Sequence, residues 1–238
     1  SQRNEKIAGW MLWNTDGNYE SVCCTTTDIY TSVNRTINGS TKYCLEQYAD
    51  HAFDLPTDYT TTKTISGSYQ PHGSPLTNGS FSSATTFIAD GFTNAPSIGE
   101  TFQFAGSGTV FTINSVTATG NSNEYTIVIN TASSQSDGVA LQFVTSKVFS
   151  DLTTHIAKTV YATSGSNEAS AVHYYGNGVV SSGGVVSFDT PASAVDIGLD
   201  FTVEVDTFSP DASATKGQLT GLPRKIAKVI LELSSTYN

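Results

Sequence analysis

The chain has 238 residues, of which 38% are hydrophobic and 13% are charged, and its formal net charge is −10. This length allows two modest domains, or one β domain that carries a second domain inserted into it. The acidic balance argues against specific DNA binding, because a phosphate-binding surface needs clustered Lys and Arg. A wall lined with carboxylates would instead repel a passing polyanion over a Debye length of about 8 Å.

Strand-forming and turn-forming residues alternate along the whole chain. Thr, Val, Tyr, Phe and Ile recur, while Gly, Ser, Asn and Asp cluster between them. No helix-length window keeps an apolar stripe at the helical period, so we predict an all-β fold of antiparallel strands. No apolar run is long enough for a membrane helix, and we therefore expect a soluble protein with no membrane anchor. Because the chain begins at Ser1 without a methionine, we expect it to be a piece of a longer polypeptide.

The first part of the chain predicts two hairpins. The turn of the first contains Asp16-Gly17, and the turn of the second is Asn38-Gly39; both supply the positive φ that tight hairpin turns require. Apolar residues alternate with polar ones in segment 29–37, which predicts a half-buried strand. The expected strands here are 7–13, 19–25, 29–37 and 43–48.

A stretch rich in Pro, Gly, Ser and Asn, residues 68–82, predicts a linker. Residues 83–147 beyond it carry their own series of short strands, which predicts a small β-barrel or sandwich held by this linker and a second one near 145–150. The expected parent β domain is then discontinuous, with residues 1–67 plus 148–238. The strands expected in the inserted module are 85–90, 100–104, 109–117, 124–130 and 139–144.

After the module, the strand pattern of the first part returns. Residues Gly176 to Gly178 predict a hairpin turn, and segment 201–208 shows the clearest alternation of apolar and polar residues. Segment 226–233 fits a strand, with a helix as the alternative. The strands expected in this part are 158–163, 171–175, 185–188, 201–208 and 226–233.

The four histidines, His51, His72, His155 and His173, lack the spacing of a metal site. Two of them have an Asp close by in sequence, in the pairs His51/Asp54 and Asp151/His155, but no G-x-S-x-G motif supplies an activated Ser, so turn or surface roles are favoured. A pair of carboxylates brought together by the fold could still hydrolyse glycosides, although acids such as Glu204 and Asp206 fit the wet face of a strand. We predict no catalytic residue, no cofactor-binding residue, no metal ligand and no cofactor.

Cysteine and tryptophan suggest structural roles. Three cysteines, Cys23, Cys24 and Cys44, cannot all pair within one chain, which favours reduced thiols. Trp10 and Trp13 are three residues apart and point to opposite faces of a straight strand. We expect one in the core, and for the other we consider two roles, an exposed platform for a sugar ring or an interface anchor.

Several segments together resemble one family of phage proteins. IAGWMLWNTDGNYESVCC resembles a stretch in phage tail-tube terminal proteins in which a Trp-containing strand, a Thr-Asp-Gly turn and a Glu-Ser-Val strand follow one another. SVNRTINGSTKYCLEQY is similar to the next strand pair of that family, an Arg-Thr-Ile-Asn-Gly hairpin that ends in Leu-Glu. The family order continues in DLTTHIAKTVYATSG, YYGNGVV, DIGLDFTVEVDTFSP and LPRKIAKVILEL, so that the resemblance covers residues 7–66 and 148–233.

This family is the nozzle of short-tailed phages, also called tail tubular protein B or stabilisation protein. The chain departs from its pattern in two places. Cys23 and Cys24 stand where the family usually has aliphatic residues, a change that buried free Cys absorbs. Residues 83–147 have no counterpart in the simplest members and look like the small β modules that decorate many phage virion proteins.

The resemblance implies a non-enzymatic structural component of the virion, assembled in the host cytoplasm. It implies a homo-oligomeric ring, a hexamer, that contacts other phage tail proteins at the distal end of the tail and surrounds the DNA exit channel. DNA would pass through without specific binding, in keeping with the negative charge. Two alternatives stay open: a carbohydrate-binding or adhesin β module with Trp and Tyr platforms, and a glycan-degrading tail enzyme.

Overall fold

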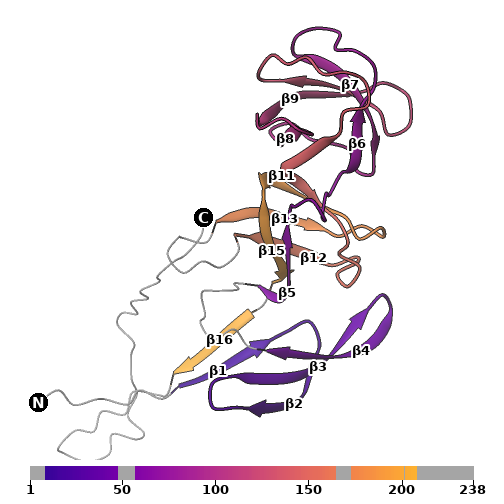
Figure 1. Ribbon diagram of the computed structural model, residues 1–238. Coiled ribbons are helices and arrows are strands. Elements are labelled where there is room, and N and C mark those ends of the chain that lie inside the picture. Colours follow the sequence, from indigo (N-terminus) through magenta and orange to yellow (C-terminus); the bar gives the residue numbers. More distant parts are fainter. Residues whose placement is uncertain (1–8, 48–56, 165–172, 201, 208–238) are drawn as a thin grey trace, which may run out of the picture. The chain divides into compact units, whose positions relative to one another are not determined.

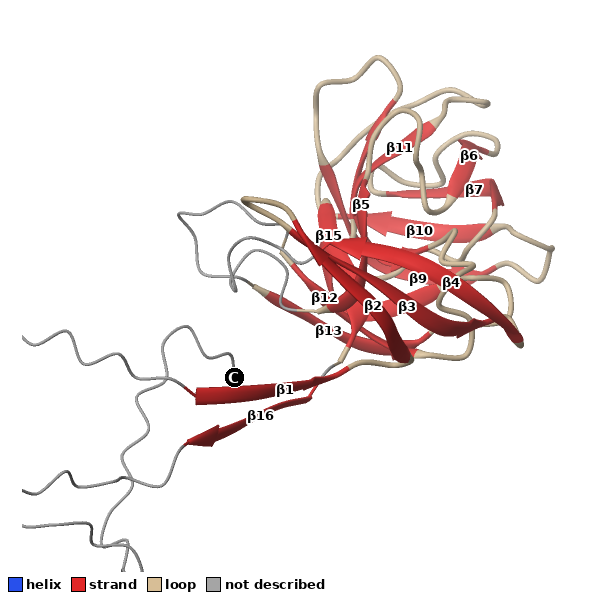
Figure 2. Ribbon diagram, turned by 90° about the horizontal axis from the view of Figure 1, so that it is seen from below, coloured by secondary structure: helices blue, strands red, loops and turns tan. Residues whose placement is uncertain are grey.

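The computed structural model describes residues 9–47, 57–164, 173–200 and 202–207. This part of the chain contains sixteen strands. Figure 2 shows it as strands and loops, with no helix. Every strand ladder in it is antiparallel, which confirms the predicted all-β antiparallel fold. The strands are β1 (Gly9–Asn14), β2 (Asn18–Cys24), β3 (Ile29–Ile37), β4 (Ser40–Gln47), β5 (Asp58–Thr64), β6 (Gly73–Thr77), β7 (Thr86–Phe92), β8 (Thr101–Phe104), β9 (Phe111–Ala118), β10 (Tyr125–Ile129), β11 (Leu141–Phe149), β12 (Thr159–Thr163), β13 (Tyr174–Val179), β14 (Val186–Ala192), β15 (Ala194–Leu199) and β16 (Thr202–Thr207).

The chain divides into two compact units, residues 1–16 with 201–238 and residues 17–200. The first unit contains the β1–β16 ladder, which joins Gly9 to Thr207 at one end and Asn14 to Thr202 at the other (Figure 1). The predicted hairpin between segments 7–13 and 19–25 is therefore wrong, although both segments form strands. Gly17, whose φ is 149°, allows close packing instead, because a Cβ at this position would collide with the backbone carbonyl of Asn34 on β3.

Strands β2, β3 and β4 form a three-stranded sheet in that order. The predicted turn at Asn38-Gly39 is confirmed, with φ of 51° and 72°, the left-handed values that a two-residue hairpin turn needs. It sets the β3–β4 register, in which Ile37 faces Ser40. The predicted half-buried strand is confirmed as well, because Thr31, Val33 and Arg35 are buried while their neighbours along β3 are less so.

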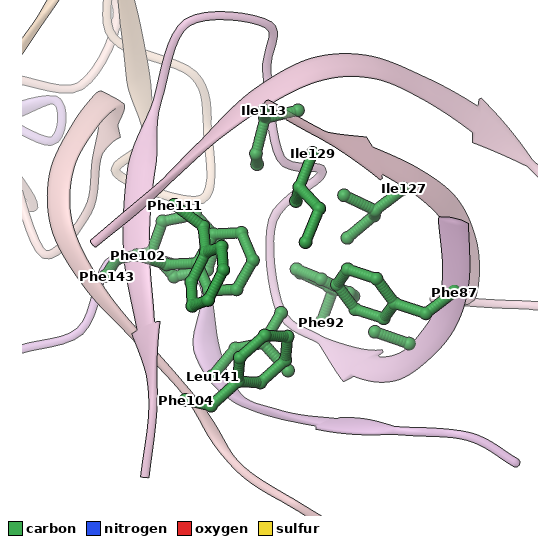
Figure 3. Close-up of a cluster of buried hydrophobic side chains, with 11 residues drawn as sticks. Phe87, Phe92, Phe102, Phe104, Phe111, Ile113, Ile127, Ile129, Leu141 and Phe143 are labelled. Carbon is green, nitrogen blue, oxygen red and sulfur yellow. The ribbon is translucent and has the colours of Figure 1, made fainter. Parts of the chain in front are cut away.

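The seven-stranded sheet has the order β14-β11-β8-β9-β10-β7-β6, and all five strands expected between residues 83 and 147 are present in it. The sheet curls until β6 meets the start of β11 at the bridge between Leu76 and Ala140, but it does not close into a barrel. Aromatic rings fill the inside of the curl (Figure 3). Its buried cluster is Phe87, Ala89, Phe92, Phe102, Phe104, Phe111, Ile113, Ile127, Ile129, Leu141 and Phe143.

Both segments expected to be linkers take part in this sheet. Within 68–82, residues 73–77 form the edge strand β6, where Pro75 is tolerated because it lies at the register shift of the β6–β7 ladder, between Gly73 and Leu76. Within 145–150, β11 continues without a break. Its first half pairs with β8, and its second half, from Ser146 to Phe149, pairs with β14. Whether residues 83–147 fold autonomously stays a prediction.

The four-stranded sheet has the order β13-β12-β15-β5. The turn predicted at Gly176 to Gly178 is wrong, since these residues lie inside β13 and pair with β12. Their glycines serve close packing instead, because a Cβ at Gly178 would lie 2.8 Å from the carbonyl oxygen of Ser187 on β14. The buried cluster here is Phe149, Leu152, Val160, Ala162, Val180, Val186, Phe188, Ala192, Val195, Ile197 and Leu199.

Candidate functional site

A buried arginine joins the three-stranded sheet to the start of β5. Arg35 lies on the central strand β3 with 2% of its surface exposed. Its Nε is 2.5 Å from Glu46 Oε1 and its Nη2 is 2.7 Å from Glu46 Oε2, so the guanidinium grips this β4 carboxylate with two hydrogen bonds. Nη2 also lies 3.0 Å from Asp58 Oδ1. One cation is therefore shared by two carboxylates that are distant in sequence.

The charge of Arg35 is held firmly in this position. Burial by itself lowers the pKa of a guanidinium, but the hydrogen bonds from Glu46 and the negative charge of Asp58 outweigh it and raise the pKa of Arg35 above its usual value. The guanidinium carbon also lies 4.6 Å from the centre of the Tyr59 ring, in cation–π contact. We name the group of Arg35, Glu46, Asp58 and Tyr59 the arginine cluster.

His155 continues the arginine cluster into the segment before β12. It is 1% exposed, and its Nε2 donates to the backbone oxygen of Tyr59 over 2.9 Å. Burial lowers the pKa of His155, and the nearby positive charge of Arg35 acts in the same direction, while the bond to Tyr59 opposes both. The surface position predicted for His155 is wrong, because the residue is buried and its ring nitrogens bond to Thr154 and to the backbone of Tyr59.

A second polar cluster lies wholly inside the curled sheet. His72, Glu100 and Ser146 are each 0% exposed. Nε2 of His72 is 3.1 Å from Glu100 Oε2 and 2.9 Å from Ser146 Oγ, while Nδ1 donates to the backbone oxygen of Asn94 over 2.9 Å. We name these three residues the histidine cluster.

The histidine cluster has the residue types of a hydrolytic triad but not its geometry. In a triad, the carboxylate and the serine bind opposite ring nitrogens, whereas here both lie at Nε2 and Nδ1 faces a backbone carbonyl. The Ser146 hydroxyl also lies 3.0 Å from Glu100 Oε1 and 2.9 Å from the backbone oxygen of Val148. This arrangement binds the segment before β6, the residue that precedes β8 and the middle of β11 together, which is a structural role.

Sequence reasoning missed both clusters, because their members are far apart along the chain. His72 and Ser146 are separated by 74 residues, and Arg35 and Asp58 by 23. One signal was present in the sequence: Arg35 lies two residues after Val33 on an alternating strand, so its side chain is expected on the same inward face. A charged residue at a core-facing position indicates a buried ion pair.

Outside these clusters, Asp196 on β15 is a further buried carboxylate. Its Oδ1 accepts from the Thr62 hydroxyl, and its Oδ2 has no hydrogen-bond partner. Throughout the described ranges, no group of three or more His, Cys, Asp or Glu side chains is placed to hold a metal ion. No helix long and apolar enough to cross a membrane occurs in that same part of the chain.

The three-stranded sheet presents apolar side chains to solvent along both of its outer strands. Val22 on β2 is 65% exposed, and Tyr43 and Leu45 on β4 are 72% and 77% exposed. All three cysteines are free thiols, as predicted, but Cys23 and Cys24 are exposed on β2 and do not fill buried aliphatic positions. Both outer strands have a neighbour on one side only within the described part of the chain.

The remaining residues considered from sequence are only partly placed. Trp10 and Trp13 lie on β1, where their backbones face Asp206 and Val203 of β16, but their side chains lie outside what is described. The side chains of Glu204 and Asp206 also lie outside what is described. His51, Asp54 and segment 226–233 lie entirely outside the described residues. His173 is exposed next to Tyr175, with ring centres 4.7 Å apart.

Comparison with known proteins adds no relative: no protein-family model, curated protein or solved structure matches the chain. The interpretation of the site therefore depends on the residues and on their geometry.

Proposed function

We propose that the chain is a non-enzymatic structural component of a short phage tail, part of the distal nozzle or tail tube around the DNA exit channel. One observation carries the proposal. Arg35 opens the Arg-Thr-Ile-Asn-Gly motif and Glu46 closes the Leu-Glu motif, and these two family positions bind each other through two hydrogen bonds. The residues that carry the resemblance thus form one physical unit, a tight hairpin closed by a buried ion pair.

The charge of the chain supports the same function. With 21 acidic and 11 basic residues, the chain repels duplex DNA on average, and Arg35, one of its cations, is buried against two carboxylates. A channel wall that conducts DNA must avoid the Lys and Arg contacts that would hold the phosphates. Exposed apolar side chains on the three-stranded sheet add surface of the kind that subunit interfaces bury.

Electron microscopy tests the proposal. The purified protein, alone or mixed with the other tail proteins of the phage, should form rings with a central channel, and antibodies against it should label the tail end of virions. It should leave the mobility of duplex DNA unchanged at low salt. A protein that stays monomeric in every mixture and labels no virion would refute the proposal.

Carbohydrate binding is the competing function, and it has one observation in its favour. The Tyr43 ring is 72% exposed on a β-sheet, and a solvent-facing aromatic ring can stack on a sugar. Binding on a glycan array that is abolished by Tyr43→Ala, together with the absence of rings, would favour an adhesin. Turnover of host polysaccharide would favour a glycan-degrading enzyme.

A further inference from the structure

We infer that His72 and Glu100 form a proton-dependent clamp inside the curled sheet. In this clamp His72 carries a proton on both ring nitrogens and pairs with the ionised Glu100 carboxylate. Loss of one ring proton at alkaline pH would leave the carboxylate buried without a counter-charge and loosen the point at which β11 exchanges β8 for β14 as its partner. The inference goes beyond the proposed function and does not rest on it, because it concerns contacts within residues 17–200 alone.

The hydrogen bonds of Glu100 indicate an ionised carboxylate. Its Oε1 accepts from the backbone N–H of Lys147 over 2.7 Å and from the Ser146 hydroxyl over 3.0 Å. Its Oε2 accepts from the backbone N–H of Ser97 over 2.7 Å. A protonated carboxyl would place its hydrogen on an oxygen that already accepts a backbone N–H, whereas an ionised one satisfies every donor.

A fully buried carboxylate needs a cation, and His72 is placed to supply it. Both side chains are 0% exposed, and Nε2 of His72 lies 3.1 Å from Oε2 of Glu100. Among the described residues, no Lys or Arg forms an ion pair with Glu100. Burial of a charge without a partner is costly, so the geometry favours a charged His72.

The two ring nitrogens of His72 give the number of protons. Nδ1 lies 2.9 Å from the backbone oxygen of Asn94, which can only accept, so Nδ1 carries a proton. Without a proton, Nε2 would turn its lone pair toward the negative charge of Glu100. With one, it donates to Glu100 or to Ser146, both within hydrogen-bond distance. The other groups that face the ring do not titrate: they are the Asn94 carbonyl, the Ser146 hydroxyl and the rings of Phe92 and Phe143.

The clamp lies where β11 changes partner. Thr145 pairs with Thr101 of β8, and the next residue, Ser146, pairs with Ala192 of β14. Glu100 directly precedes β8 and binds the Ser146 hydroxyl and the Lys147 N–H at this change. Below about pH 6.5 an unfolded histidine is protonated too, so the clamp contributes fully to stability there. As the pH rises further, the unfolded chain has lost a proton that the folded clamp still holds, and stability falls until the folded ring loses it as well.

Nitrogen NMR of the histidine rings in the full chain, at about pH 7, tests the protonation directly. Both ring nitrogens of His72 should be protonated. His155 is the internal control, because burial lowers its pKa and it should show one protonated and one bare nitrogen. Glu100→Gln should remove one N–H resonance of His72, and His72→Gln assigns the signals. A bare nitrogen on His72 in the wild type would overturn the inference, even if neither variant folds.

Urea unfolding between about pH 7 and about pH 9 tests the clamp itself. The unfolding equilibrium constant of the wild type should rise with pH, by at most about tenfold per pH unit for one proton. The double variant His72→Gln/Glu100→Gln lacks the clamp and should lose this rise. His155→Gln is the matched control, since it replaces a buried histidine that is already neutral in this range, and it should keep the rise. A rise that is absent in the wild type, or equally large in the double variant, would overturn the inference.

Discussion

Replacing Arg35 by Met is the sharpest test of the arginine cluster. The change removes a 2%-exposed cation and leaves Glu46 and Asp58 without it, although 20% and 17% of their side chains remain exposed. Breaking a buried ion pair by removing one partner costs about 3–5 kcal/mol, and the partial exposure of both carboxylates places the expected loss of unfolding free energy at about 3–4 kcal/mol. For a unit of this size, this loss lowers Tm by about 6–16 °C.

Thermal and urea unfolding, followed by circular dichroism, measure the effect. Lys42→Met is the matched control, because Lys42 faces Arg35 across the β3–β4 ladder but is exposed, and its loss should change stability by no more than about 0.5 kcal/mol. Adding Glu46→Gln and Asp58→Asn to Arg35→Met should recover part of the stability, since no unpaired carboxylate remains. A single variant that loses less than about 1 kcal/mol, or a triple variant less stable than the single one, would contradict the reasoning.

Three further predictions follow from the packing. Phe102→Ala removes a fully buried ring and should cost about 3–5 kcal/mol in urea unfolding, against less than about 1.5 kcal/mol for Phe102→Leu; similar losses for both would contradict the packing. The pKa of His155 is lowered in the folded protein, so on acidification the unfolded chain takes up a proton first, and the free energy of unfolding should fall as the pH drops below about 6.5. His155→Gln should flatten this dependence of the unfolding free energy on pH. An unchanged dependence in the variant would contradict the burial of His155. A fragment of residues 70–147, with its own aromatic cluster, should unfold cooperatively by itself, and a broad transition would refute autonomy.

Local pattern was enough to predict much of the strand content. The alternation in 29–37 and the Asn38-Gly39 turn gave β3, its hairpin and the start of β4, because both signals act between neighbours in sequence. Strand pairing was harder, since Asp16-Gly17 and Gly176 to Gly178 look like turns but allow close approach of another strand. A glycine that forms a turn and a glycine that lets another strand approach look the same in the sequence. Only the strand packed against the glycine, which is distant in sequence, distinguishes the two roles.

The polar clusters show the same limit more strongly. Nothing near His72 in the sequence indicates Glu100 or Ser146, because the curl of the sheet brings the three together. The Thr-rich strand β5 and the short strand β15 were missed for a related reason. β5 has no buried apolar residues to produce alternation, and five of the six residues of β15 are buried, which removes the alternation there.

The ladder between β1 and β16 affects the timing of synthesis. Gly9 pairs with Thr207, so β1 emerges from the ribosome about 200 residues before its partner, a delay of about 10–40 s at ordinary translation rates. Throughout this interval the sequence Gly-Trp-Met-Leu-Trp-Asn lacks β16, the strand with which it pairs in the described part of the chain. The unit of residues 17–200 can fold during the delay, whereas the β1–β16 ladder forms only after Thr207 has been made. Nascent β1 is therefore an apolar segment to which a chaperone can bind before β16 has been made.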